Sequence, residues 1–284
     1  MKLIELTHHI RDMLRREGIE SAVLDSQLIA GHVLGFGRED VLLNPERIVS
    51  EVVDEALLLA VRRSKCEPMA YILGYREFRS LRFEVNQAVL IPRPETELLV
   101  EKVLEVMGGL GSAPRVLELG TGSGCVAVSL AVARPKACVV ATDICPNALE
   151  VAQRNSRAHG GIVEFVKADM TDMTSEGLPK ILGQKFDIIV SNPPYIGKAE
   201  QRELPKDVGF EPCIALDGGE DGLMFYRAIA SNAYKICNQN AWLVLEIGCG
   251  QAADVVGILK SISAQNIHIS QDLAGLDRVI SAQI

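Results

Sequence analysis

Hydrophobic residues in the first 65 positions recur with helical spacing only. The apolar positions of three expected helices are Ile10 and Leu14; Leu24, Leu28 and Val33; and Val53, Ala56, Leu57, Ala60 and Val61. Gly18 and Gly35 are expected to end the first two helices, and Ser50 is a candidate N-cap for the third. The pattern predicts a small helical bundle.

The pattern changes after this bundle. Within residues 76–91, Phe78, Phe83 and Val85 come close to an alternation of apolar and polar positions, and two prolines follow. Alternation over a short segment is typical of strands with one buried face. We therefore expect a β-hairpin that links the bundle to the rest of the chain.

From residue 96 onward, helical and strand-like segments alternate. Helices are expected at 96–107, 123–133, 146–158, 221–236 and 250–261, and strands at 115–119, 138–143, 163–166, 186–191, 241–247, 267–270 and 276–281. Runs such as 138–141 and 186–190 are almost continuously apolar, as strands covered on both faces require. The chain is thus expected to be an α/β protein with a doubly wound, mainly parallel, seven-stranded sheet.

These patterns predict three parts, a helical domain at 1–75, a hairpin linker at 76–95 and a Rossmann-like domain at 96–284. Composition supports a folded protein, because 48% of the residues are hydrophobic and 23% are charged. The formal net charge of −8 argues against a protein that mainly grips nucleic-acid phosphates. No stretch of 18 apolar residues or signal-peptide pattern occurs, so a cytoplasmic location without membrane contact is expected.

Cysteine spacing gives no sign of a metal site. The seven cysteines are scattered, and none forms a C-x-x-C pair. Free thiols in a reducing compartment and no bound metal are therefore expected.

A glycine-rich loop follows the strand 115–119. Glycines at 120, 122 and 124 allow close approach of a ligand to the backbone, although a purely structural tight turn is the alternative. A dinucleotide fingerprint would have glycine or alanine at position 125, where Cys125 stands, so the spacing favours S-adenosylmethionine. The residues expected to bind this cofactor here are Glu118, Gly120, Thr121, Gly122, Ser123 and Gly124.

Two acids lie at or just beyond the ends of the next two strands. Asp143 ends the strand 138–143 and could accept both ribose hydroxyls, although it could instead cap the following helix. Asp169 could accept a hydrogen bond from the adenine amino group, while Met170 covers the face of the adenine ring. A solvated acid beside a core methionine is the alternative for this second pair.

The sequence Asn192-Pro193-Pro194-Tyr195 directly follows the strand 186–191. Two prolines stop the strand and fix the backbone at the carboxyl edge of the sheet. The Asn192 side chain and the Pro193 carbonyl could then accept hydrogen bonds from a planar NH₂ group, while the Tyr195 ring packs on that group. Pro194 completes the expected substrate site, in which Asn192, Pro193 and Tyr195 are the candidate catalytic residues. Asn192 is also expected to contact the cofactor. A chance turn is the alternative.

Together with these motifs, several segments resemble the HemK/PrmC family of class I methyltransferases. The segments are IPRPETE at 91–97, EP at 211–212 with ALDGGEDGL at 215–223, LEIGCGQ at 245–251 and DLAGLDR at 272–278. The resemblance covers nearly the whole chain and implies methylation of a glutamine side chain in the Gly-Gly-Gln motif of class I peptide-chain release factors. It also implies that the amino-terminal helices help to recognise the partner. Met170 departs from the family, in which a tryptophan or another bulky residue often follows the acid.

The resemblance implies S-adenosylmethionine as methyl donor, S-adenosylhomocysteine as product, and a monomer without direct nucleic-acid contact. One alternative is a DNA or RNA amino-methyltransferase, in which the Asn-Pro-Pro-Tyr motif would hold a flipped base. Residues 1–85 carry 12 Lys and Arg against 14 Asp and Glu, which counts against a basic recognition region. A Rossmann-type oxidoreductase or an inactive nucleotide-binding module is the other alternative, which leaves the Asn-Pro-Pro-Tyr motif unexplained.

Overall fold

The computed structural model describes residues 1–172 and 185–284. By internal contacts, the chain divides into two compact units. One unit comprises Met1–Tyr75 and Pro205–Phe210, and the other comprises Arg76–Leu204 and Glu211–Ile284. We describe each unit separately.

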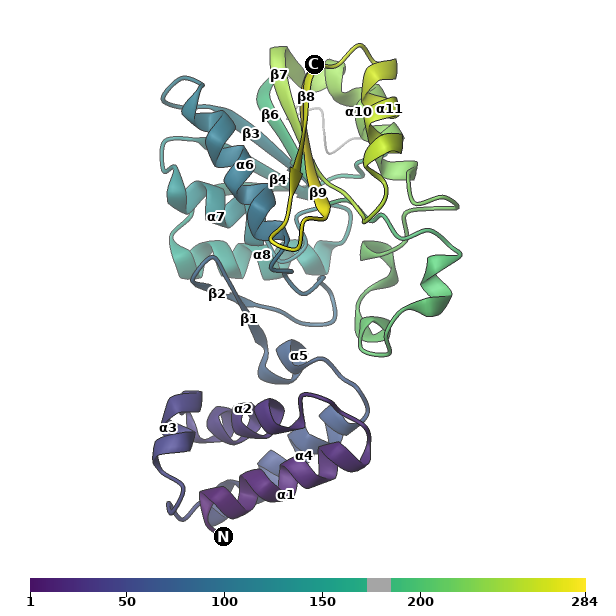
Figure 1. Ribbon diagram of the computed structural model, residues 1–284. Coiled ribbons are helices and arrows are strands. Elements are labelled where there is room, and N and C mark those ends of the chain that lie inside the picture. The colour runs from purple at the N-terminus through teal and green to yellow at the C-terminus, as the bar shows by residue number, and fades with distance from the viewer. Residues whose placement is uncertain (173–184) are drawn as a thin grey trace. The chain divides into compact units, whose positions relative to one another are not determined.

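The first unit is helical (Figure 1). Its elements are α1 (Leu3–Arg16), α2 (Ala22–Leu34), α3 (Arg38–Leu43), the 3₁₀ turn η1 (Ser50–Val52), α4 (Val53–Ser64) and α5 (Met69–Leu73). Leu3, Leu6, Ile10 and Leu14 form one fully buried stripe along α1. Their spacing of three and four residues explains this, because it places them on the same face of the helix.

Several expectations for this unit were wrong in detail. Helices α3 and α5 were not expected, and Val61 on α4 is 42% exposed. Leu24 is 43% exposed, because α2 instead turns Asp25, Ser26 and Ile29 inward. The buried Asp25 carboxylate accepts from Nε of Arg63 on α4 at 2.7 Å, and this ion pair helps to fix the rotation of the helix. Ser50 does not cap α4, because it opens η1.

A β-hairpin with a two-residue loop lies at the boundary of the two units in sequence, as expected. Strand β1 (Tyr75–Phe78) pairs with β2 (Leu81–Glu84) through a turn at Arg79 and Ser80. These two residues have φ values of 48° and 60°, the left-handed pair that matches the twist of the strands in a hairpin.

The second unit contains a seven-stranded sheet with the order β5-β4-β3-β6-β7-β9-β8. Its strands are β3 (Arg115–Leu119), β4 (Cys138–Asp143), β5 (Val163–Lys167), β6 (Phe186–Ser191), β7 (Cys237–Glu246), β8 (Gln265–Gln271) and β9 (Asp277–Gln283). The first five strands in this order are parallel, and β9 runs antiparallel to both of its neighbours. The expected mainly parallel sheet is thus confirmed, although β7 begins four residues before the expected strand.

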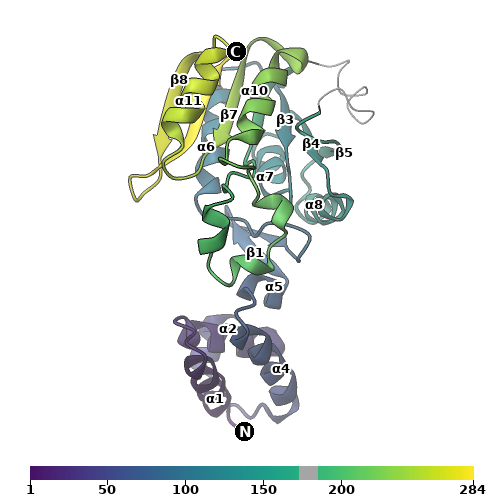
Figure 2. The same cartoon turned by 90° about the vertical axis from the view of Figure 1, so that its right-hand side faces the viewer.

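Helices cover both faces of the sheet (Figure 1). They are α6 (Thr96–Gly108), α7 (Cys125–Ala133) and α8 (Pro146–His159) on one face, and α10 (Met224–Ile236) and α11 (Ala252–Ser261) on the other. Figure 2 shows α10 and α11 side by side on their face. Strands β3 and β6 are almost entirely buried between these layers, which explains why most of their residues are apolar.

The order of the strands decides which loops meet. Leu119 of β3 is level with Thr142 of β4 and with Ser191 of β6, and Ser191 is level with Leu245 of β7. The loops that follow these four strands therefore emerge side by side. In open α/β sheets, ligands bind outside such carboxyl ends, where the strand order reverses.

Within the described residues, no helix is both long and apolar enough to cross a membrane.

Candidate active site

A cavity of about 420 Å³ lies at the carboxyl edge of the sheet. This volume falls within the range usual for small-molecule sites, about 300–1,000 Å³. Its lining comprises residues 88–90, Gly120, Gly122, 143–145, Ala148, 168–171, Asn192, Pro194, Pro212, 214–215, 224–225 and Ala228. The cavity thus brings together the glycine loop, both strand-end acids and part of the Asn-Pro-Pro-Tyr motif.

The glycine loop depends on left-handed backbone. Gly120, Gly122 and Gly124 have φ values of 73°, 54° and 81°, which side-chain-bearing residues rarely adopt. A Cβ on Gly124 would also lie 3.0 Å from the Cβ of Ala152 on α8. The alternating glycines therefore let the loop turn sharply from β3 into α7, and α7 begins at Cys125 rather than at 123.

Glu118 lies behind this loop, outside the lining of the cavity. Its Oε2 accepts from the Thr121 hydroxyl at 2.5 Å and from the Ala127 backbone N–H at 3.1 Å. Burial raises the pKa of Glu118 to about 8, although these hydrogen bonds oppose the shift. Glu118 thus supports the loop from within the core. Thr121, Ser123 and Gly124 are likewise outside the lining.

Asp143 lines the cavity. Its Oδ2 accepts from the Gly122 N–H at 2.8 Å, and its Oδ1 accepts from the Cys145 N–H at 2.9 Å. Burial raises its pKa, and these backbone hydrogen bonds lower it. The carboxylate makes no N-cap bond, because Cys145 is the N-cap residue of α8. Ile144 also gives this carboxylate a backbone hydrogen bond. A carboxylate has about four acceptor positions, so these three bonds leave acceptor capacity for a ligand.

Asp169 and Met170 both line the cavity. Asp169 Oδ1 accepts from the backbone N–H and the hydroxyl of Thr171, each at 2.7 Å. The Met170 methyl group packs on the glycine loop, 2.6 Å from where a Cβ on Gly120 would lie. The thioether therefore borders both the loop and the cavity.

The Asn-Pro-Pro-Tyr motif contributes Asn192 and Pro194 to the lining, whereas Pro193 and Tyr195 lie outside it. Nδ2 of Asn192 donates to the Thr96 hydroxyl oxygen at 3.3 Å. The Tyr195 carbonyl accepts from Nε2 of Gln251 at 2.9 Å, and burial raises the pKa of its phenol to about 12. The motif is thus anchored from two sides.

Two residues near the site, Glu246 and Asn155, were not among the site residues expected from the sequence. Glu246, at the end of β7, is only 2% exposed, and burial raises its pKa to about 7. The available signal was a single acid in the otherwise apolar segment 241–247. Asn155 on α8 had no local signal, because its partners lie far away in sequence.

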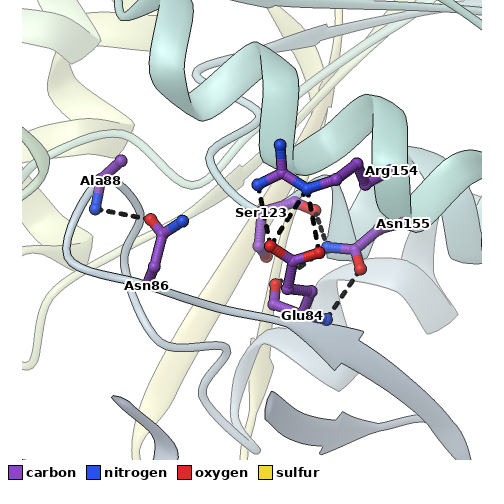
Figure 3. A network of polar contacts seen from close by, with 6 residues as sticks. All are labelled: Glu84, Asn86, Ala88, Ser123, Arg154 and Asn155. Atoms are coloured by element: carbon purple, nitrogen blue, oxygen red, sulfur yellow. Dashed lines mark hydrogen bonds and ion pairs between the residues drawn. The ribbon is translucent and has the colours of Figure 1, made fainter. Parts of the chain in front are cut away.

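Asn155 connects the hairpin to the glycine loop (Figure 3). Its Oδ1 accepts from the Glu84 N–H at 2.7 Å, and its Nδ2 donates to the carbonyls of Glu84 and Ser123 at 3.0 and 2.8 Å. Asn86 then accepts from the N–H of Ala88, the first residue of the cavity wall at 88–90. One side chain therefore ties two parts of the site together.

Two family models match this chain. The PrmC N-terminal domain matches residues 5–74, and the methyltransferase small domain matches residues 94–206. A release factor glutamine methyltransferase of Geobacter sulfurreducens is 39% identical over 276 residues, which cover 96% of this chain and 94% of that protein. The chain belongs to the release factor glutamine methyltransferase family. The resemblance noted in the sequence is confirmed.

A second relative in the release factor glutamine methyltransferase family, from Neisseria gonorrhoeae, is 44% identical over 259 residues, covering 90% of this chain and 91% of that protein. Among solved structures, a methyltransferase from Pyrococcus furiosus matches with a TM-score of 0.51 and 16% identity, covering 82% of this chain and 98% of that one. At this identity the match supports only the methyltransferase fold.

Proposed function

We propose that this chain transfers the methyl group of S-adenosylmethionine to the side-chain amide nitrogen of the glutamine in the Gly-Gly-Gln motif of peptide-chain release factors. The main support is that Asn192 and Pro194 line the same cavity as the glycine loop and Asp143. An amide-binding motif thus stands next to a site suited to a nucleoside. Similarity over nearly the full length to release factor glutamine methyltransferases supports the choice of substrate.

The cavity residues fit S-adenosylmethionine. The remaining acceptor capacity of Asp143 suits a ribose hydroxyl, and Asp169 suits the adenine amino group. Met170 provides a polarisable apolar surface for the adenine ring. When bound, the cofactor supplies an electrophilic methyl group on a sulfonium. The left-handed turn at Gly120 and Gly122 leaves room for a ligand close to the backbone.

The acceptor nitrogen needs alignment more than deprotonation. An amide nitrogen is a poor nucleophile, because its lone pair is delocalised into the carbonyl. Holding the NH₂ group in line with the methyl group lowers the entropic barrier. Acceptors at Asn192 and at the Pro193 carbonyl would also stabilise the positive charge that develops on nitrogen. The methylated amide cation is acidic enough to lose its proton to water.

Mass spectrometry of a release factor incubated with the protein and S-adenosylmethionine tests the proposal. We expect one added methyl group on the glutamine of the Gly-Gly-Gln motif. A release factor with asparagine at that position serves as the control and should remain unmodified. Methylation of DNA or RNA with an unmodified release factor would instead support the nucleic-acid alternative.

Asn192→Ala links the activity to this site. Losing one preorganised partner of the transition state lowers kcat by roughly 10²–10³. S-adenosylmethionine should bind this variant nearly as well as the wild type, because the proposed contact is to the acceptor amide. A folded Asn192→Ala protein with wild-type kcat would contradict the proposed role of the side chain.

A further inference from the structure

The Asn192 amide can present either its oxygen or its nitrogen to the cavity. Only the oxygen can accept a hydrogen bond from a substrate NH₂ group. In the structure, Nδ2 donates to the Thr96 hydroxyl oxygen at 3.3 Å, which leaves Oδ1 for the cavity. The function of the motif thus depends on what holds the amide in this orientation.

A buried carboxyl group lies behind Asn192. Ser191 pairs with Leu245, so Asn192 and Glu246 are the next residues at the ends of neighbouring parallel strands. Glu246 is not part of the cavity lining, and its side chain is enclosed by protein. Thr96, which is also buried, and Asn192 both hydrogen-bond to its carboxyl group.

The stability of the fold does not by itself explain why a carboxyl group occupies the buried position 246. Among the described residues, its Oε2 atom has no hydrogen-bond partner. Burying an incompletely paired carboxylate is costly, and an apolar residue of similar volume often stabilises such a position better. Each unsatisfied buried polar atom therefore calls for an explanation. The contact of Glu246 with Asn192 gives a functional reason for a carboxyl group at this position.

We propose that Glu246 is a positioning residue which, directly and through the Thr96 hydroxyl, keeps the nitrogen of Asn192 turned inward and its oxygen turned toward the cavity. This inference rests on the proposed function, in which Asn192 accepts a hydrogen bond from the amide NH₂ group of the substrate.

The polarity of the hydrogen bonds explains the effect. An ionised Glu246 can only accept, so the Thr96 hydroxyl donates to it, and the Thr96 oxygen accepts from Nδ2 of Asn192. A protonated Glu246 can donate to Thr96 instead. The Thr96 hydrogen is then available to Oδ1 of Asn192, which favours the reversed amide. The rate of methyl transfer should therefore rise as Glu246 loses its proton.

Several ionisable groups surround this carboxyl. They are Glu95, Cys125, Tyr195, Tyr226 and Arg278. Burial raises the pKa of the Cys125 thiol and of the Tyr195 phenol to about 12, and that of Tyr226 further. Arg278 remains charged, because Asp272 raises its pKa. Burial raises the pKa of Glu246 to about 7, and repulsion from Glu95 contributes.

The first test measures kcat for a release factor across pH in the wild type and four variants, with cofactor affinity measured by calorimetry. In the wild type, kcat should rise through about pH 7. Glu246→Gln should lower kcat about tenfold or more and remove this rise, with little change in cofactor affinity. Thr96→Val should also lower kcat and remove its rise with pH. Thr96→Ser, which keeps the hydroxyl, should retain the kcat and the pH profile of the wild type.

Glu118→Gln is the matched comparison, because Glu118 is also a buried acid at the end of a strand but supports the glycine loop. It should weaken cofactor binding and retain the rise of kcat with pH. If Glu246→Gln weakens cofactor binding and leaves the pH profile intact, Glu246 has a structural role and the inference is wrong.

The second test needs no activity. In protein labelled with ¹⁵N-asparagine, the side-chain NH₂ resonance of Asn192, assigned with Asn192→Ala, should shift through about pH 7. Glu246→Gln should abolish this shift, and an unchanged shift would overturn the inference. The wild type could methylate no release factor while the Asn192 NH₂ resonance still titrates as expected. In that case the proposed function is wrong, but the positioning of Asn192 by Glu246 is supported.

Discussion

Asn155→Ala removes the side chain that joins the hairpin to the glycine loop. Three hydrogen bonds are lost, at 2.7, 2.8 and 3.0 Å, and one N–H and two carbonyls lose their partner. Leaving a buried polar group unsatisfied costs about 1–3 kcal/mol each, but such costs are not additive and water can replace part of the network. We therefore expect a loss of about 2–4 kcal/mol in the free energy of unfolding.

Arg154→Ala is the matched control. Arg154 neighbours Asn155 on α8 and pairs with the carboxylate of the same Glu84, but both side chains are 43% exposed. Exposed ion pairs contribute about 0–1 kcal/mol. Figure 3 shows the two interactions side by side, so the comparison separates the buried amide from the exposed charge.

Equilibrium urea unfolding, followed by the fluorescence of the single tryptophan, Trp242, measures both variants. Cofactor affinity should also fall more in Asn155→Ala than in Arg154→Ala, because the Ser123 carbonyl belongs to the glycine loop. If the two variants unfold within about 0.5 kcal/mol of one another, the network does not carry the stability that we assign to it.

Three further predictions concern the loop and the cavity. Asp143→Ala should weaken S-adenosylmethionine binding by about 1.5–3 kcal/mol, the scale of hydrogen bonds to a charged group, and unchanged affinity in calorimetry would remove Asp143 from the site. Gly124→Ala should destabilise the fold by about 1–3 kcal/mol in urea unfolding, because of its left-handed backbone and the contact with Ala152; a neutral effect would contradict this. Burial raises the pKa of Glu118 from 4.5 to about 8, so the native state holds a proton that the unfolded state loses, and this group's contribution to stability should fall as pH rises across that interval. Glu118→Gln should flatten the pH dependence of the urea midpoint, and an unchanged slope would refute the shift.

The sequence determined the strands that precede the site. The segments 115–119, 138–143 and 186–191 match β3, β4 and β6 in both bounds. Strands buried on both faces are mostly apolar, and a glycine, an acid or a proline pair marks the end of each of these runs. Local composition therefore carries enough information to place them, together with the loops that follow.

Local periodicity was insufficient where distant partners decide the structure. The short helices α3 and α5 contain too few turns to show a period, and neither was expected. The inward face of α2 depends on Arg63, which lies 38 residues beyond Asp25.

Only the tertiary structure brought Glu246 behind Asn192 and Asn155 beside Glu84. The first pair meets because β6 and β7 are neighbours in the sheet, and the second is separated by 71 residues in sequence. A hydrophobic pattern indicates which side of a segment is buried, but it does not specify which other segment covers that side. Strand order and register supply this information, because they decide which chain ends meet at one edge of the sheet.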